Sequence, residues 1–227
     1  MSYAIVFSSK TGNTALLAQT LQEQLPQADC CYFGAPDAAA LAADTLYVGF
    51  WTDKGKADAD TLDFLQQLHG KRVFLFGTAG FGGSAPYFEK ILAATRKALD
   101  GSNTVIGSFM CQGKMPMSVR QRYEAMKAQP AHIPNLDALI ENFDKALSHP
   151  DAADLEQLKQ AVSELKKKRP HIVLCGRSFC ISYIGQTLVN GGFGAPDAND
   201  GGGDLFPAVA AAYAVHPQAG ALLVAAQ

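Results

Sequence analysis

The sequence predicts an α/β fold with a doubly wound, five-stranded parallel sheet and a C-terminal extension. Short apolar runs alternate with helical patterns over the first two thirds of the chain, a loop rich in Ser, Thr and Gly follows the first run, and a Gly/Ala-rich segment ends the chain. With 227 residues, 48% of them hydrophobic, the chain can bury a full core and exceeds one typical domain.

Five apolar runs bounded by turn residues are the expected strands, at 3–7, 30–33, 45–50, 73–76 and 105–110. Helical spacing of apolar residues predicts helices near 16–25, 62–68, 88–99, 119–128, 134–147 and 151–168. Strands that alternate with helices favour a parallel sheet covered on both faces. In such folds ligands bind beyond the carboxyl ends of the strands, so the loops after the first, third and fourth strands are the expected binding loops.

Charge divides the chain into two predicted parts, a domain over residues 1–169 and an extension over 170–227. The first part holds 18 of the 19 Lys and Arg residues and 18 of the 21 Asp and Glu residues. The second has four charged residues, nine glycines and eleven alanines, and its residues 170–176 resemble a further strand. A net charge of −2 gives no support to a nucleic-acid-binding function.

Cysteine usage and hydropathy predict a cytoplasmic protein without a membrane span. The five cysteines are odd in number and form no Cys-x-x-Cys pair, which disfavours a disulfide framework and a zinc site. No apolar run reaches the ~18 residues of a spanning helix, and the first residues lack the basic start of a signal peptide. The five histidines are scattered, and none is expected to have a metal-ligand neighbour.

The loop after the first strand has the composition of a phosphate cradle. Six of its seven residues are Ser, Thr, Gly or Asn, and a helix follows at once: Ser8, Ser9, Lys10, Thr11, Gly12, Asn13 and Thr14. A helix N-terminus offers unpaired N–H groups to an anion, and hydroxyls add further donors. The alternative is a helix capped by Ser or Thr without a ligand. The loop has neither the Walker A spacing nor the Gly-x-Gly-x-x-Gly spacing.

The loops after the third and fourth strands suit a planar ring. The third strand leads into Trp51, the only tryptophan, which either stacks on such a ring or covers the local core. The loop after the fourth strand contains four glycines, which free its backbone to bond the edge of a heterocycle, or else make it a flexible connection. Candidate residues in these two loops are Trp51, Thr52, Gly55, Thr78, Ala79, Gly80, Phe81, Gly82, Gly83 and Tyr87.

The segment 5–14 resembles the FMN phosphate signature of the flavodoxin family. The family pattern [Ser/Thr]-x-Thr-Gly-x-Thr falls on Ser9, Thr11, Gly12 and Thr14, and the resemblance covers about residues 1–165. The later run 111–116, which reads CQGKMP, is similar to a flavodoxin-like branch associated with bacterial bilirubin reductase. The family resemblance implies FMN as the cofactor.

The resemblance also implies roles for the second and third loops. Trp51 would stack on the isoalloxazine, and Gly55 is a candidate for the peptide beside flavin N5. The loop after the fourth strand would contact the pyrimidine and supply a second aromatic ring, either Phe81 or Tyr87, although Tyr87 is equally a candidate for the helix face. Lys54 and Lys56 are expected to be solvated charges.

The function expected is FMN-dependent electron transfer to a partner reductase. FMN accepts one or two electrons, so no catalytic side chain is required of the protein. Two alternatives stay open: an NAD(P)H-dependent quinone or flavin reductase on the same fold, and an interaction module without flavin. The first 169 residues depart from the family in one respect, because flavodoxins are typically acidic and these residues are neutral.

Overall fold

A five-stranded parallel sheet in the order β2-β1-β3-β5-β6 forms the centre of the fold. The computed structural model describes residues 1–129, 135–167, 171–175, 178–183 and 186–188. The doubly wound parallel sheet predicted from the sequence is confirmed. Its strands are β1 (Tyr3–Phe7), β2 (Cys30–Gly34), β3 (Thr45–Asp53), β5 (Arg72–Ala79) and β6 (Thr104–Gln112).

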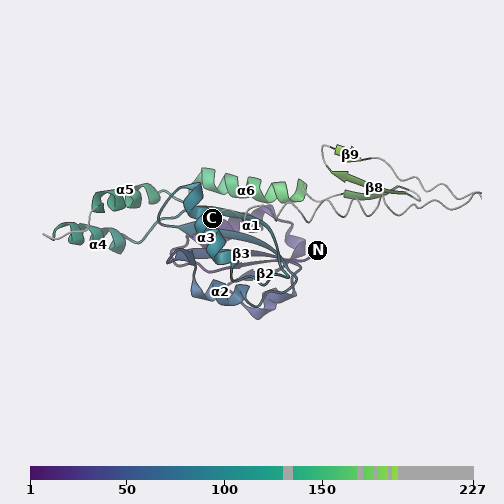
Figure 1. Cartoon of the computed structure of the whole chain (residues 1–227), viewed down its shortest axis with the longest axis horizontal. Coiled ribbons are helices and arrows are strands. Elements are labelled where there is room, and N and C mark those ends of the chain that lie inside the picture. The colour runs from purple at the N-terminus through teal and green to yellow at the C-terminus, as the bar shows by residue number, and fades with distance from the viewer. Residues whose placement is uncertain (130–134, 168–170, 176–177, 184–185, 189–227) are drawn as a thin grey trace, which may run out of the picture. The chain divides into compact units, whose positions relative to one another are not determined.

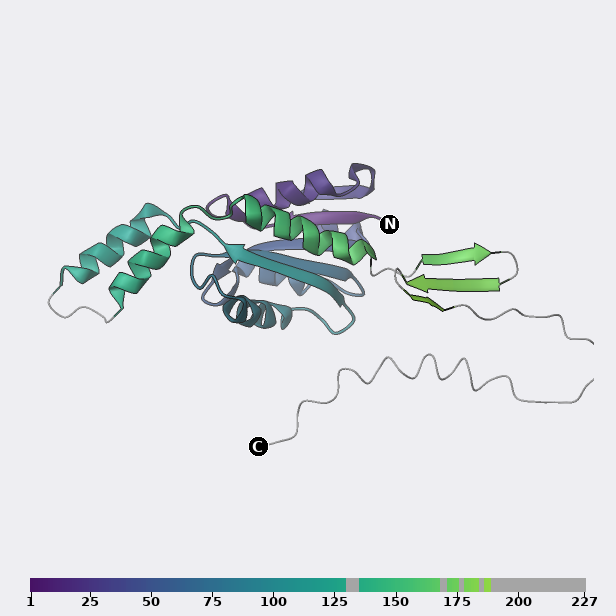
Figure 2. The same ribbon diagram turned by 90° about the horizontal axis from the view of Figure 1, so that it is seen from above.

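Helices cover both faces of this sheet (Figures 1 and 2). Helices α1 (Asn13–Gln24) and α6 (Ala152–Lys167) pack on one face, and α2 (Ala59–Leu65) and α3 (Ala85–Arg96) pack on the other. Successive strand residues point to opposite faces, so Ala4 and Val6 enter one core while Tyr3 and Ile5 enter the other. The continuous apolar runs seen in the sequence follow from this burial on both sides.

Two short 3-10 helices lie in the connections around β2. They are η1 (Gln27–Asp29), before β2, and η2 (Ala38–Ala42), between β2 and β3. The Asp37 carboxylate accepts a hydrogen bond from the Ala39 N–H, which caps η2 and holds the chain as it turns toward β3.

A short strand, β4 (Lys56–Ala57), adds an antiparallel ribbon to the end of β3 and was not predicted. Strand β3 continues to Asp53, three residues beyond its predicted end, because Thr52 and Asp53 pair with this strand. The turn between β3 and β4 consists of Lys54 and Gly55, with φ angles of 48° and 82°. Positive φ at both central residues matches the twist of a tight two-residue hairpin.

Helices α4 (Met117–Lys127) and α5 (Leu136–Ala146) form a hairpin between β6 and α6 (Figure 2). Tyr123 and Phe143 are buried, and the Arg120 guanidinium joins the two helices through the Asp144 carboxylate, with Nε 3.0 Å from Oδ1. Both helices were predicted close to these positions.

The described residues divide into two units, one that holds those up to His171 together with Tyr183 and Gln186, and one that holds residues 172–175, 178–182 and 187–188. Strands β7 (His171–Cys175), β8 (Ser178–Tyr183) and β9 (Gln186–Leu188) form a separate three-stranded sheet. The strand predicted at 170–176 is therefore confirmed, whereas the rest of the predicted extension, from 189 onward, lies outside the described residues. No helix in the described ranges is long and apolar enough to cross a membrane.

Candidate functional site

The loop after β1 carries the donors of the predicted phosphate cradle. Ser8 N–H donates to the Gly49 carbonyl at 3.0 Å, which continues the pairing of β1 with β3. Gly12 caps α1 with a φ of 86°, a backbone conformation that favours glycine, and no atom lies near the position of a Cβ there. The Ser9 hydroxyl accepts from the Ala15 N–H at 3.2 Å. The exposed Lys10 and the half-exposed Thr11 complete the loop.

Asn13 braces this loop against the end of β6. Its Nδ2 donates to the Thr11 hydroxyl oxygen and to the Lys114 carbonyl, each at 2.9 Å. The side chain is buried, yet no hydrogen-bond donor in the described part of the chain reaches its Oδ1. A buried acceptor without a protein partner in this loop fits a ligand that brings hydroxyl groups, as the ribityl phosphate of FMN does.

Thr14 and Thr78 join the first loop to the ends of β3 and β5. The Thr14 hydroxyl donates to the Phe50 carbonyl at 3.2 Å and lies 3.3 Å from the Thr78 hydroxyl, and both side chains are buried. Thr52 donates from its hydroxyl to the Thr78 carbonyl at 2.9 Å. The hydroxyl of Thr14 is thus directed at the sheet, so its backbone N–H is the group that remains for an anion at the helix N-terminus.

Trp51 lies beside the phosphate loop and precedes the hairpin turn. The Lys10 ammonium is 4.7 Å from the centre of its ring, a cation–π contact that links the first and third loops. The indole is only partly buried, so a ring face can meet a ligand. Gly55 is exposed at the tip of the same segment.

The loop after β5 is shaped by close contacts to its glycines. Ala79 continues β5, and its carbonyl accepts from the Gly113 N–H at 3.0 Å. A Cβ on Gly82 would overlap the Tyr87 ring, so this glycine allows Tyr87 to fold back on the loop and pack against the core. Phe81 instead faces Tyr123 of α4, with ring centres 6.5 Å apart. Gly83, with φ 46°, lies beside the Gln112 side chain.

Two residues that the sequence did not indicate hold the Gly80 peptide in place. Asn142 of α5 donates to the Gly80 carbonyl at 2.9 Å, and Gln112 of β6 donates to the same oxygen at 3.4 Å. Gln112 also donates to the Asn142 Oδ1 at 3.1 Å. The α4–α5 hairpin therefore fixes the orientation of a peptide in the predicted flavin loop, over a separation of 62 residues from Gly80.

Cys111, near the end of β6, is buried and structural in character. Burial raises the pKa of its thiol well above the ordinary value, with smaller contributions from Asp154 and Asp151. A thiol of this kind is a poor nucleophile near neutral pH.

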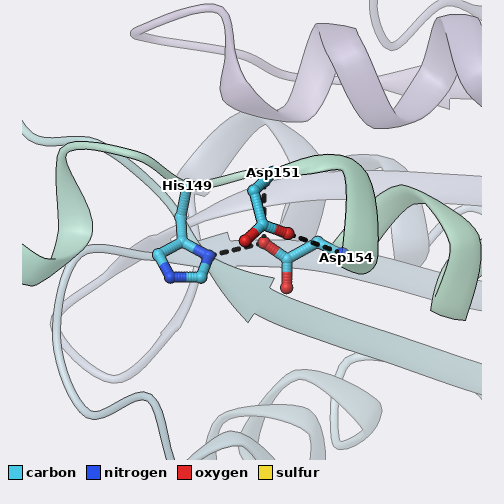
Figure 3. A group of neighbouring side chains, drawn as sticks. All are labelled: His149, Asp151 and Asp154. Atoms are coloured by element: carbon cyan, nitrogen blue, oxygen red, sulfur yellow. Dashed lines mark hydrogen bonds and ion pairs between the residues drawn. The ribbon is translucent and has the colours of Figure 1, made fainter.

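A cluster of His149, Asp151 and Asp154 lies at the start of α6, with Asp154 in its first turn (Figure 3). The expectation that no histidine has a metal-ligand neighbour is wrong here, because the turn brings His149 Nδ1 to 2.6 Å from Asp154 Oδ2. Asp151 accepts from the N–H groups of Ala153 and Asp154, and Asp154 accepts from the Asp151 N–H. Both carboxylates thus satisfy helix N–H groups, which explains the cluster without an ion.

A family model described as a flavodoxin domain matches residues 4–163, which include all three loops. The chain belongs to the flavodoxin family. The flavodoxin-like domain-containing protein BilS of Clostridium symbiosum (strain WAL-14163) is 40% identical over 173 residues, covering 68% of this chain and 90% of that relative. BilS of Clostridioides difficile (strain CD3) is 26% identical over 163 residues, with the same coverage. These relatives support the branch indicated by segment 111–116.

Among solved structures, a flavodoxin from Streptococcus pneumonia TIGR4 is similar to this flavodoxin at 20% identity and a TM-score of 0.42. The match covers 74% of this chain and all of that one. Family membership establishes FMN as the cofactor and electron transfer as the general activity. The phosphate loop fits this cofactor, because it combines a helix N-terminus, hydroxyl donors and the unpartnered Asn13 oxygen.

Proposed function

We propose that this flavodoxin carries electrons on FMN to a partner reductase. The observation that carries the proposal is the joining of three loops at the carboxyl edge of the sheet, through hydrogen bonds among Thr14, Phe50, Thr52 and Thr78. Such an edge is where doubly wound folds bind their ligands. Bound there, FMN supplies one-electron and two-electron chemistry, and the protein holds and orients it.

Each loop has a separate part in holding the cofactor. The N-terminus of α1 with Ser9, Thr11 and Asn13 would bind the phosphate and adjacent hydroxyls. Trp51 would stack on one face of the ring, and Gly55 would present its peptide in the turn beside that ring. Backbone groups between Gly80 and Gly83 would meet the polar edge of the ring. Phe81 remains the better candidate for a second aromatic contact, because Tyr87 packs against the core.

The experiment that tests this function separates a carrier from a self-sufficient reductase. The full chain is loaded with FMN and mixed with NADH or NADPH and a quinone, without a second protein. A carrier shows only slow NAD(P)H oxidation under these conditions, but once reduced by dithionite it passes electrons rapidly to a one-electron acceptor such as cytochrome c. Steady and rapid NAD(P)H oxidation would instead establish the quinone or flavin reductase. A chain that stays colourless after FMN addition would favour an interaction module.

We also infer that the carrier works in the cytoplasm and that its flavin domain ends near residue 169. The exposed free thiol of Cys31 and the half-buried free thiol of Cys30 support a reducing compartment. The family match, which ends at residue 163, supports the boundary. Fractionation of the producing cells tests the location, and FMN binding by residues 1–169 tests the boundary.

A further inference from the structure

Four lysines on or beside the loops of the candidate flavin site are exposed and free of ion pairs among the described residues. They are Lys10, Lys54, Lys56 and Lys114, and we refer to them as the cationic rim. The net charge of the chain does not reveal this local positive charge, because the chain as a whole carries a charge of −2.

The fold places three of these lysines on two of the loops that would surround the flavin, and Lys114 on the segment that follows β6. Lys10 lies over the Trp51 ring, and Lys54 and Lys56 lie in the hairpin that follows Trp51. Lys114 is held beside the phosphate loop by the hydrogen bond from Asn13 to its carbonyl. The rim therefore lies along the first loop, the hairpin after β3 and the segment after β6, beside the edge at which the flavin would bind.

Cations elsewhere in the described first unit are often neutralised by neighbours. Arg96 pairs with Glu89 at 2.5 Å, Arg120 with Asp144 at 3.0 Å, and Lys127 with Asp137. Acids near the rim are Asp53 in the hairpin and the pair Asp151 and Asp154, which lie beside His149, whose carbonyl accepts from the Lys114 N–H at 2.9 Å. A further group of acids, Asp37, Asp60 and Asp63, lines a separate surface hollow between η2 and α2.

We propose that the cationic rim is the docking surface for an acidic face of the redox partner protein. This inference rests on the proposed electron-carrier function and adds the chemistry of the partner to it. Exposed, unpaired charges of one sign around an active edge speed the encounter with a surface of opposite sign. The four lysines are exposed in the free protein, so they can orient the partner without first breaking an ion pair.

The test compares two haem proteins of opposite charge as electron acceptors. The full chain, loaded with FMN and reduced by dithionite, is mixed in a stopped-flow instrument with an acidic soluble cytochrome b5 domain or with basic mitochondrial cytochrome c. In each reaction one electron from the reduced flavin converts one ferric haem iron to ferrous iron. The second-order rate constant is measured between about 10 and 300 mM NaCl, over which charge screening becomes strong.

Docking by the rim predicts opposite salt dependences for the two acceptors. The rate constant with cytochrome b5 should fall roughly tenfold over this range, and the rate constant with cytochrome c should rise. The variant K56E/K114E should weaken or reverse both slopes. The control K97E/K159E makes the same change of total charge at the residue that caps the C-terminus of α3 and within α6, away from the rim, and should keep the wild-type slopes. The reduction potential of the flavin is measured in every variant, so that a change in the driving force for electron transfer is distinguished from a change in docking.

Two results would overturn the inference. One is a rate with cytochrome b5 that rises with salt, or does not change. The other is an equal effect of K56E/K114E and K97E/K159E, which would mean that total charge alone sets the rates. A chain that fails to bind FMN would contradict the proposed function itself, whereas an FMN-loaded chain with the wrong salt dependence contradicts only the docking surface.

Discussion

The two signature threonines of the phosphate loop have different surroundings, although the sequence pattern gives them equal weight. Thr14 is buried and its hydroxyl holds the loops together through the Phe50 carbonyl. Thr11 is partly exposed, and its hydroxyl oxygen accepts a hydrogen bond from Asn13. The proton of the Thr11 hydroxyl is therefore available to a phosphate, whereas that of Thr14 is already used.

The variant Thr11→Val should weaken FMN binding about tenfold, because a hydrogen bond of this kind contributes about 1–1.5 kcal/mol. Fluorescence quenching of FMN on titration with the protein measures the dissociation constant. Thr20→Val is the matched control, since the Thr20 hydroxyl donates within α1 to the Leu16 carbonyl. If both variants bind FMN like the wild type, Thr11 does not contact the phosphate.

Cys111 should make the folded state less stable at alkaline pH. Burial raises the pKa of its thiol in the folded protein, while the unfolded chain ionises near pH ~8.5. The stabilisation is fully present below the unfolded pKa and is lost as the pH rises toward the folded pKa, by up to about 1.4 kcal/mol per pH unit. Urea unfolding between pH 7 and 10 measures the decline, which should be shallower for Cys111→Ala. Equal slopes for the two proteins would contradict this assignment.

At the scale of elements, the strands were predictable and the hairpin contacts were not. The central strands β1, β3 and β5 are buried on both faces, so each appears in the sequence as an apolar run such as 73–76. The β3–β4 ribbon has no such apolar run in the sequence, because it consists of a turn and two short strand ends. Nor does any local pattern relate Asn142 to Gly80, since the contact depends on how α5 packs.

The α4–α5 hairpin should influence FMN binding through Asn142. Replacing Asn142 by Ala removes the 2.9 Å hydrogen bond to the Gly80 carbonyl and the partner of Gln112. We expect a loss of about 1 kcal/mol in stability and a several-fold weaker FMN affinity. Glu141→Ala, at an exposed neighbouring position in α5, should change neither quantity beyond the small effect of its surface pair with Lys145. FMN affinity unchanged in Asn142→Ala would show that the Gly80 peptide is not part of the cofactor site.

The hairpin turn after β3 should be sensitive to substitution at Gly55. Its φ of 82° is unfavourable for residues with a Cβ, so Gly55→Ala should reduce the free energy of unfolding by about 1 kcal/mol. Gly101→Ala is the control, because no atom lies near the position of a Cβ on Gly101 and its φ angle is not positive. Thermal unfolding of both variants measures the difference, and a turn that tolerates both changes equally would contradict the described hairpin geometry.

At the scale of the whole molecule, the sheet separates two buried cores and brings three loops to one edge. The hydrogen bonds of Thr14 and Thr52 connect these loops, Asn13 ties the first loop to the segment after β6, and α4–α5 supports the last loop. The family match accounts for residues 4–163, and the strands β7–β9 follow this region in the chain. The site is thus assembled from the part of the chain that carries the family pattern.

The central claim is that these three loops bind FMN, and an absorbance titration tests it most directly. Added FMN should bind with a stoichiometry of one per chain and show the shifted, structured visible bands of a flavin in a partly buried site. The double variant Thr11→Val/Trp51→Ala should lose most of this binding while retaining its circular dichroism spectrum. A folded chain that leaves the FMN spectrum unchanged, or a double variant that binds like the wild type, would contradict the account.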